Sequence, residues 1–588
     1  MKKSLAILLM LSMLAAIFVG CTEVPSEPLK NEPPKSVSYK PGTYEGEADG
    51  FHGKIKLSVT VDEQAIQSVQ ILEQAETVGI ADGALETIPK EIVNQQSLAV
   101  DTVSGATYTS NGILAAAEQA LLNAGGDIAA LKTPAKEKEL AQGKDEQVDV
   151  VIVGGGLAGL MAGVELQRNY PDLTFTIVEQ LPVFGGSLPT TGGAVFATDS
   201  KWHKEQGAVS TVDDVVQYLK ESSKEAPLNE QLIKNVFSLS GETFDWYVDF
   251  GVPFEKELAL STTHSNKLYV GWTQDRTNGG GADFYKTLAR ALPDLNMDIR
   301  LNSKATDLIV ENGVVKGINV EDSQQRYNIY AEKVILTTGG FANNSEYMAK
   351  YAPKFADGII TTYAGSNGDG FYFVEQFGTK VVGDGTMGTF YASNGKTTQQ
   401  MPFMVTSEGK RFVNESDLSY RMQRVIADDA NGHAFQIVDS QNSKIDAVKQ
   451  AEQDGIWKKY ESIADLAKDL GINEANLQKE IENYNTAITN NQSPGFGLPV
   501  EKAEKIQTGP FYAGEVVVRT FSTIPGIQVS SNMEVLDSTG TAIPNLYAAG
   551  ELTAGNIFSH QYPGAGFGLS YASNSGRFVA KQVADSIK

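Results

Sequence analysis

The chain has 588 residues with 41% hydrophobic and 20% charged side chains, an ordinary globular composition and a length sufficient for several domains. Its formal net charge is −24. Such an acidic surface repels nucleic acids, so we exclude them as partners. The single cysteine and the five scattered histidines exclude disulfides, cysteine-ligated iron–sulfur clusters and c-type haem, and they predict no metal site. Any redox chemistry therefore requires organic cofactors.

The first 21 residues have the pattern of a lipoprotein export signal. Lys2 and Lys3 precede an apolar run over residues 5–19, and Gly20-Cys21 follows it. The run is shorter than the ~20 apolar residues that a membrane span needs. We expect a signal peptide over residues 1–21 and an extracytoplasmic protein anchored to the cell membrane by a lipid on Cys21. The alternative is an ordinary signal peptide whose cysteine is incidental.

A short linker and a compact block come next. Residues 22–38 are rich in Pro, Glu, Lys and Ser, which is typical of a flexible linker. The block over residues 39–130 contains strand patterns at 42–48, 54–61 and 67–72 and a helical pattern at 112–124. It predicts a small α+β domain. The charged segment over residues 131–147 predicts a second linker.

Strands that alternate with helices begin at Val148 and predict a parallel, doubly wound sheet. The first strand runs into Gly154-Gly-Gly-Leu-Ala-Gly159 and a helix. Gly154 permits a tight turn, Gly156 lets the backbone approach a pyrophosphate, and Gly159 lets helix and strand pack closely. The second strand ends at Glu179, at the interval expected for an acceptor of ribose hydroxyl hydrogen bonds. These features together predict dinucleotide binding.

Three more glycine-rich segments follow: Phe184-Gly-Gly-Ser-Leu-Pro-Thr-Thr-Gly-Gly193, Thr337-Thr-Gly-Gly340 and Leu546-Tyr-Ala-Ala-Gly-Glu551. The order of the motifs resembles that of the FAD-binding flavoproteins related to fumarate reductase, succinate dehydrogenase and urocanate reductase, from about Val148 to the C-terminus. This resemblance implies an α/β protein. Its Rossmann-like FAD-binding domain would cover residues 148–365 and 508–588, with an inserted α+β capping domain over residues 366–507.

The resemblance also implies which residues bind FAD, the non-covalent hydride carrier of this family. Besides Gly154, Gly156 and Gly159, they are Ala158, Glu179, Gly186, Ser187, Thr191, Gly192, Gly193, Ala305, Gly339, Asp369, Glu551, Gly566 and Leu569. The capping domain is expected to close over FAD and exclude water. Within it, Ser462-Ile-Ala-Asp465 has the pattern of a capping box, Gly471 ends that helix, and Asn473 begins a second helix that runs to about Thr486.

A second flavin is indicated by Asp101-Thr-Val-Ser-Gly-Ala-Thr107-Tyr-Thr-Ser. This segment resembles the signature of FMN-binding domains, which carry FMN through a phosphoester bond on threonine. The resemblance implies covalent FMN on Thr107, attached by a flavin transferase, with Thr109 as the alternative position. Because the chain has no haem signature, we expect FMN to receive electrons from a quinol-based or flavin-based membrane donor and pass them to FAD.

The resemblance further implies a proton donor. In these reductases hydride goes from FAD N5 to a carbon–carbon double bond, and an arginine after Gly-Lys-Arg-Phe-Val-Asn-Glu supplies the proton. That segment is present as Gly409–Glu415, and Arg421 follows it at a slightly longer spacing. Arg424 is the alternate, and a surface position for Arg421 is the competing interpretation.

Other positions depart from fumarate reductases. Ser522 and Gln561 stand where that family has its substrate-binding histidine and its clamping arginine, and the upstream His-Pro is replaced near Tyr391. Fumarate is therefore a doubtful substrate, because a dicarboxylate needs cationic partners. Tyr562-Pro-Gly-Ala-Gly566 is similar to a segment of 3-ketosteroid dehydrogenases that holds a ketone oxygen.

The catalytic candidates are Arg421, Tyr562, Tyr391 and His560. A packed aromatic is the competing interpretation for Tyr562, and a buried core histidine is the equal alternative for His560. We predict an exported two-flavin oxidoreductase that reduces an activated double bond in a small enoate or enone. The first alternative is a ketosteroid-like dehydrogenase that desaturates its substrate. The second is an electron-transfer lipoprotein without catalytic activity.

Overall fold

The computed structural model describes residues 38–50, 53–76, 81–100, 102–103, 107–133, 140–223, 228–262, 264–274 and 280–587. The predicted signal peptide, Cys21 and nearly all of the first linker lie outside these residues. Among the helices within them, none is both long and apolar enough to cross a membrane.

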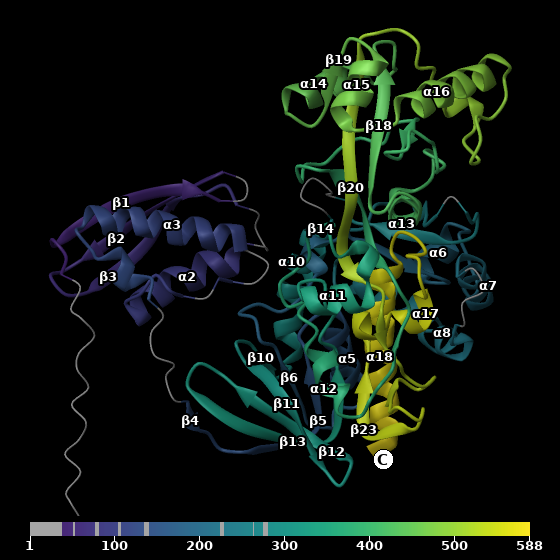
Figure 1. The fold of residues 1–588 in the computed structure, drawn as a ribbon. Helices are drawn as coiled ribbons and strands as arrows, with labels where there is room; N and C mark the ends of the chain where they lie inside the picture. Colours follow the sequence, from purple (N-terminus) through teal and green to yellow (C-terminus); the bar gives the residue numbers. More distant parts are fainter. Residues whose placement is uncertain are drawn as a thin grey trace, which may run out of the picture.

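The small N-terminal domain has a three-stranded antiparallel sheet in the order β1-β2-β3 (Figure 1). Its elements are β1 (Gly42–Asp49), β2 (Lys54–Val61), β3 (Ile66–Glu73), α2 (Asp82–Gln95), α3 (Thr107–Asn123) and α4 (Ile128–Leu131). Helix α3 lies so close to β1 that a Cβ on Gly46 would be 1.9 Å from the carbonyl oxygen of Ala116. The three predicted strands are confirmed, and α3 begins five residues before the predicted position 112.

A nine-stranded sheet forms the centre of the large part of the chain. Its main order is β10-β6-β5-β13-β12-β11, and β23 also pairs with β13. Strands β10, β6, β5 and β23 and the second half of β13 are parallel, as predicted. The bounds are β4 (Ala141–Gln142), β5 (Glu146–Val153), β6 (Phe175–Val178), β10 (Ile299–Arg300), β11 (Lys304–Glu311), β12 (Val314–Glu321), β13 (Gln325–Leu336), β22 (Glu534–Leu536) and β23 (Ala542–Ala548).

The second predicted linker needs correction. Strand β4 pairs with the start of β13, and β5 begins at Glu146. The end of the segment over residues 131–147 therefore belongs to the sheet, because backbone pairing does not require the apolar side chains that the sequence pattern lacks.

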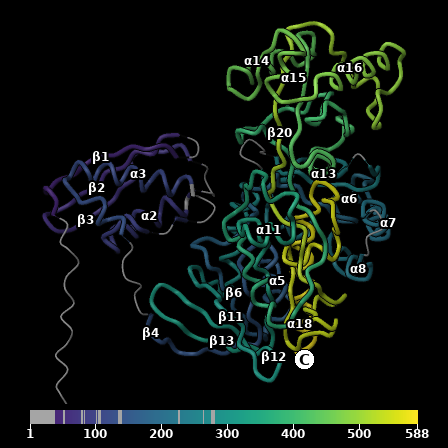
Figure 2. Tube along the Cα trace, in the orientation of Figure 1, coloured from purple at the N-terminus to yellow at the C-terminus, as the bar shows by residue number. Residues whose placement is uncertain are grey.

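Helices cover the sheet and extend the domain. Helix α5 (Leu157–Asn169) follows β5, and α18 (Phe567–Ile587) packs beside it (Figures 1 and 2). A three-stranded sheet and five helices continue this part: β7 (Ala194–Ala197), β8 (Ala259–Leu260), β9 (Tyr269–Trp272), α6 (Lys201–Glu205), α7 (Val212–Ser222), α8 (Glu230–Phe237), α9 (Ser240–Asp249) and α10 (Gly281–Ala291). The remaining short elements are α11 (Ser345–Tyr351), α12 (Asp369–Glu375), β15 (Val381–Val382), β21 (Gly526–Ile527) and α17 (Gly555–Phe558).

The cap rises from one end of this body, green in Figure 2. Its six-stranded sheet contains β14 (Ile359–Ile360), β16 (Thr386–Ala392), β17 (Met404–Val405), β18 (His433–Asp439), β19 (Lys458–Tyr460) and β20 (Phe511–Thr523). Its helices are α13 (Ser419–Asp429), α14 (Ile445–Gln453), α15 (Ile463–Leu470) and α16 (Glu474–Thr489). Strands β14 and β20 extend the cap's sheet beyond the predicted limits at residues 366 and 507.

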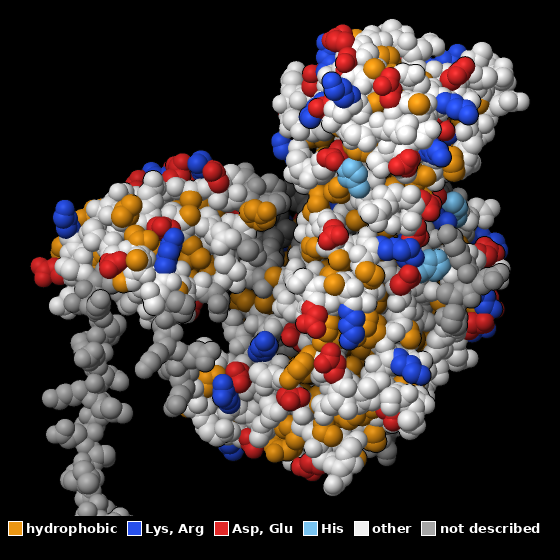
Figure 3. All heavy atoms as spheres, in the orientation of Figure 1, with side chains coloured by type: hydrophobic (Ala, Val, Ile, Leu, Met, Phe, Trp, Pro, Cys, Tyr) orange, Lys and Arg blue, Asp and Glu red, His pale blue; other side chains and the backbone are white. Residues whose placement is uncertain are grey.

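Two predicted helix starts in the cap are confirmed. The Ser462 hydroxyl accepts a hydrogen bond from the Asp465 N–H, Gly471 ends α15 in the left-handed conformation, and the Asn473 side chain caps α16. On the face of the molecule in Figure 3, acidic and basic side chains are interspersed over body and cap.

Candidate flavin and substrate site

The turn between β5 and α5 has the geometry of a phosphate cradle. Gly154 has φ of +108°, and a Cβ on Gly159 would be 2.0 Å from the Gly154 carbonyl oxygen, so both positions require glycine. Gly156 begins α5 without a side-chain cap. A Cβ on Gly156 would meet no atom closer than the Gly186 Cα, 4.0 Å away. The uncapped N–H groups of α5 thus face an open space that suits a pyrophosphate.

A first cavity lies beside this turn, and the end of β6 closes it. Its lining includes five residues of the predicted flavin set: Gly154, Gly156, Glu179, Ala305 and Asp369. The Glu179 carboxylate accepts hydrogen bonds from the N–H groups of Gly155 (2.7 Å) and Leu181 (2.8 Å). Burial raises the pKa of Glu179 to about 7. This is an acceptor-rich pocket of the kind that holds a ribose.

A second cavity of about 510 Å³ continues from the same turn. It shares Gly156, Thr337 and Tyr363 with the first cavity. Its lining includes most of the remaining predicted flavin residues, namely Ala158, Gly186, Ser187, Thr191, Gly192, Gly193, Gly339, Glu551, Gly566 and Leu569. Gly159 lines neither cavity and acts by close packing, as its predicted role requires. Two adjoining cavities on one glycine cradle fit an extended dinucleotide such as FAD.

The far part of the second cavity is aromatic. Tyr391 from β16, Tyr420 from α13 and Tyr562 line it, together with Phe521 and Phe558. The Tyr420 and Tyr562 rings meet nearly perpendicularly at 83°, with centroids 5.5 Å apart. The Tyr562 hydroxyl oxygen accepts a hydrogen bond from the Gly568 N–H at 3.1 Å, and burial raises the pKa of Tyr562 to about 12. Tyr562 therefore stays protonated at neutral pH, and its hydrogen remains available for a ligand.

Ser522 lies at the boundary between the flavin part and this aromatic part. Its hydroxyl donates to the Glu551 carboxylate at 3.0 Å, and the Thr523 N–H donates to the same carboxylate at 2.8 Å. Burial raises the pKa of Glu551. The serine that replaces the expected histidine therefore organises Glu551.

The structure places both candidate proton-donating arginines outside the lining of this cavity. Ser419 and Tyr420 line it, but the Arg421 guanidinium turns to Asp417, with 3.4 Å between Nε and the carboxylate. Arg424 pairs with Asp384 and Asp428 and donates to the His560 carbonyl oxygen. In this structure, therefore, neither guanidinium lines the cavity.

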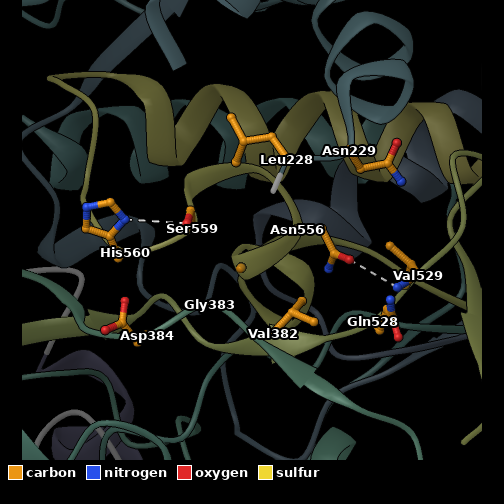
Figure 4. A pocket seen from close by; sticks show the side chains of 11 residues that line it. Leu228, Asn229, Val382, Gly383, Asp384, Gln528, Val529, Asn556, Ser559 and His560 are labelled. Atoms are coloured by element: carbon orange, nitrogen blue, oxygen red, sulfur yellow. Dashed lines mark hydrogen bonds between the residues drawn. The ribbon is translucent and has the colours of Figure 1, made fainter. Parts of the chain in front are cut away.

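His560 lines a different cavity, of about 650 Å³, together with Asp384, Ser559 and Asn229 (Figure 4). Its imidazole Nδ1 is 3.5 Å from the Ser559 hydroxyl oxygen. The geometry gives no support to the prediction that His560 contacts the substrate.

The FMN attachment segment is described in part. Thr107 begins α3, but its side chain lies outside the described structure. Thr109 is 3% exposed and its hydroxyl donates to the Glu76 carboxylate. The hydroxyl of Thr109 is therefore already engaged, which favours Thr107 over Thr109 as the acceptor of the flavin.

Several residues of the cavity lining were missed by the sequence analysis, among them Tyr363, Tyr420, Arg519 and Phe521. For two of these four residues, the sequence pattern could have indicated a position on the cavity. Arg519 and Phe521 alternate with buried residues along β20, which is typical of a strand with one face on a cavity. Nothing in the local pattern around Tyr363 or Tyr420 distinguishes it from a packed tyrosine.

Comparison with known proteins identifies the family of the chain. Residues 149–569 match the FAD binding domain family, and the chain belongs to that family. Residues 50–122 match the FMN-binding domain. These matches confirm the predicted cofactors, FAD and FMN, and attachment of FMN to a threonine is typical of the second family.

Two curated relatives and one solved structure are similar to it. The NADH:acrylate oxidoreductase of Vibrio harveyi is 27% identical over 90% of this chain and 59% of its own length, so the chain spans less than two thirds of that relative. The urocanate reductase of Eggerthella lenta is 25% identical over 86% of each chain. The open conformation of a flavocytochrome c3 fumarate reductase has a TM-score of 0.60 with 22% identity, over 75% of this chain and 79% of its own, and shares the fold.

Proposed function

We propose that the protein reduces an activated carbon–carbon double bond in a small enoate or enone. The observation that carries the proposal is the continuous second cavity, which joins the flavin cradle to a cluster of tyrosines. FAD, when bound, supplies hydride from N5. The substrate would lie in the aromatic part of the cavity, beyond the flavin. The printed names of the two relatives, an acrylate oxidoreductase and a urocanate reductase, support this class of substrate.

Tyr562 would polarise the substrate. Its protonated hydroxyl can donate to a carbonyl or carboxyl oxygen of the bound molecule. Such a donor stabilises the negative charge that develops on that oxygen while hydride adds to the β-carbon. The Gly566 backbone lines the same cavity and can supply a second donor.

Tyr420 is the proton donor that the geometry favours. Tyr420 lines the second cavity, whereas Arg421 does not, and the Tyr420 hydroxyl oxygen is buried beside Thr262. Burial raises the pKa of Tyr420, so it carries its proton at neutral pH. Arg421, four residues from Asp417 and paired with it, remains the alternative that the family resemblance implies.

The export and electron-input parts of the proposal rest on sequence motifs. A lipid on Cys21 would anchor the protein outside the cytoplasm, and FMN placed on Thr107 by a flavin transferase would receive electrons from a membrane donor. The FMN-binding domain match supports this path because the same chain holds both flavin domains.

Desaturation is the second candidate function. In that direction Tyr562 would hold the carbonyl oxygen, and Tyr420 would have to be in its phenolate form to accept the proton next to the carbonyl while hydride leaves for oxidised flavin, because a catalyst accelerates both directions of one reaction. The direction depends on the potential of the substrate couple and on the electron partner.

The test is an assay of the full-length protein carrying both flavins. Dye-reduced protein is mixed with urocanate, cinnamate, acrylate, fumarate and an enone steroid, and oxidation of the dye is followed. We expect turnover with at least one monocarboxylate or enone and little with fumarate. Turnover only with oxidised dye and a saturated ketone would favour desaturation. If no substrate is turned over in either direction, electron transfer is the function that remains.

Tyr420→Phe and Arg421→Ala are compared on the best substrate, and the larger loss of kcat identifies the proton donor.

A further inference from the structure

Arg519 is a basic side chain in the aromatic part of the cavity, and the proposed reduction gives it no role. Arg519 lies on the face of β20 that lines the second cavity, and the neighbouring strand β16 contributes Tyr391 to the same face. The guanidinium is 3.9 Å from the centroid of the Tyr391 ring and 4.2 Å from that of Phe521. Its Nε donates to the Thr361 hydroxyl at 2.5 Å. These contacts fix the position and orientation of the charged group.

Among the described residues Arg519 has no acidic partner. In the part of the chain that the structure describes, no carboxylate lies within 4.0 Å of its nitrogens, whereas Arg411, Arg424 and Arg577 are each paired with glutamate or aspartate. Glu551, which lines the same cavity, is held by Ser522 and Thr523 at the flavin end. Burial lowers the pKa of Arg519, which shows that its charge is poorly solvated. A half-buried cation without a partner is costly unless a ligand supplies the anion.

We infer that Arg519 binds the carboxylate of the substrate, and that the substrate is a planar unsaturated monocarboxylate with an aromatic or similarly flat body. This inference rests on the proposed function and names the substrate class for it. The planar guanidinium can hold a carboxylate through two parallel N–H···O hydrogen bonds, which fixes the double bond relative to the flavin cradle.

The number of basic side chains that line the cavity indicates whether the substrate carries one carboxylate or two. Among the described residues Arg519 is the sole basic side chain in the lining. The second charge of a dicarboxylate would therefore have no basic partner among the described lining residues. The rings of Tyr391 and Phe521 flank Arg519. Tyr420 and Tyr562 line the same cavity, and these aromatic walls suit a flat apolar body.

Binding is measured on oxidised full-length protein with both flavins. Cinnamate and its uncharged analogue cinnamamide are titrated separately, and the FAD absorption change gives each Kd. We expect the wild type to bind cinnamate at least about 10-fold more tightly than the amide. In Arg519→Gln the affinity for cinnamate should fall by about 100-fold, as expected for loss of one partner of a desolvated charge pair, while the affinity for the amide changes by less than about 3-fold.

Arg519→Lys keeps the charge without the planar fork and should recover part of the affinity for cinnamate. The matched control is Arg326→Gln, because Arg326 is an exposed arginine that pairs with Glu321 far from the cavity. It should leave both Kd values unchanged. FAD content and the unfolding temperature report whether each variant folds.

In the dye-linked assay, Arg519→Gln should raise KM for cinnamate by about 100-fold, with a smaller change in kcat. Equal affinity of the wild type for cinnamate and cinnamamide would overturn the role of Arg519, as would a preference for fumarate, and either result would leave double-bond reduction standing. Failure to reduce any alkene would instead overturn the proposed function itself. The two failures are therefore distinguishable.

Discussion

At the scale of single residues, His203 ties the stability of the protein to pH. It lies in the short helix α6 with 0% exposure, and its Nδ1 is 2.6 Å from the Ser200 hydroxyl oxygen. Its Nε2 is buried and has no hydrogen bond to the described residues. Burial lowers the pKa of His203 from 6.5 to about 4, because the charged ring would be poorly solvated.

The pKa of His203 predicts acid sensitivity. Since the pKa is lower in the folded than in the unfolded protein, unfolding takes up a proton between pH 6.5 and about 4. The contribution of neutral His203 to the free energy of unfolding is fully present above pH 6.5. As the pH falls towards 4, the free energy of unfolding decreases by up to about 3 kcal/mol. Calorimetric unfolding across this range should show a smaller pH dependence for His203→Asn than for the wild type. His264→Asn, at a side chain that is 41% exposed, is the control. Parallel curves for His203→Asn and the wild type would contradict the prediction.

Residue-scale reasoning from sequence reaches furthest where the geometry around a residue depends on its immediate neighbours. Gly154, Gly159 and Glu179 were predicted because a strand, a tight turn and a helix are contiguous in the chain. Tyr420 could not be predicted, and the alternation along β20 indicates a cavity-facing position for Arg519 but not its role, because the importance of both residues depends on which residues from other segments surround them. The missing counter-ion of Arg519 is visible only in three dimensions.

At the scale of elements, a buried ion-pair cluster joins three helices of the FAD-binding body. Arg577 from α18 donates to Glu165 of α5 at 2.8 Å and to Glu242 of α9 at 2.9 Å. Its guanidinium also lies 3.5 Å from the centroid of the Trp246 ring. Because Arg577 and Glu165 are 1% and 5% exposed, removal of Arg577 leaves the Glu165 carboxylate buried without its positive partner.

Arg577→Met should therefore destabilise the protein by about 3–5 kcal/mol. Chemical unfolding monitored by tryptophan fluorescence measures the change, with FAD retention as a second readout. Arg168→Met is the matched control: Arg168 stacks on the same Trp246 from the exposed side, so its loss should cost less than about 1 kcal/mol. Adding Glu165→Met to Arg577→Met should restore part of the stability. Similar losses for Arg577→Met and Arg168→Met would refute the cluster's role.

Element boundaries were predictable where a capping residue marks them, as at Ser462 and Asn473. The boundaries were not predictable where hydrogen bonding to a distant strand decides where an element begins or ends. Strand β20 joins the cap's sheet through β16, β18 and β19, and β4 joins the central sheet through β13. Backbone hydrogen bonds between distant segments leave no signature in either segment alone.

At the scale of the whole molecule, the two flavin domains have separate hydrophobic cores. One core contains only residues between Tyr39 and Leu131, and the other begins at Val150. Each core is formed from its own segment of the chain, so the two domains are expected to fold and to load their flavins independently.

Thr107→Val should therefore abolish covalent flavin and leave FAD content unchanged. Mass spectrometry of protein produced together with the flavin transferase measures the adduct, and FAD is quantified after acid release. Thr109→Val is the control that should keep the adduct, since the Thr109 hydroxyl is already bonded to Glu76. An FMN-sized adduct on Thr107→Val would place the attachment elsewhere, and loss of FAD along with FMN would contradict independent loading.

The sequence by itself determined the family, both cofactors and the flavin cradle, because these depend on short contiguous motifs whose local geometry follows from glycine and from strand–helix order. Only the tertiary structure showed which residues come together in the part of the cavity beyond the flavin cradle. Tyr391, Tyr420, Arg519 and Tyr562 come from separate segments, and the charge balance and polarity that they create together are properties of an enclosed volume rather than of any stretch of chain.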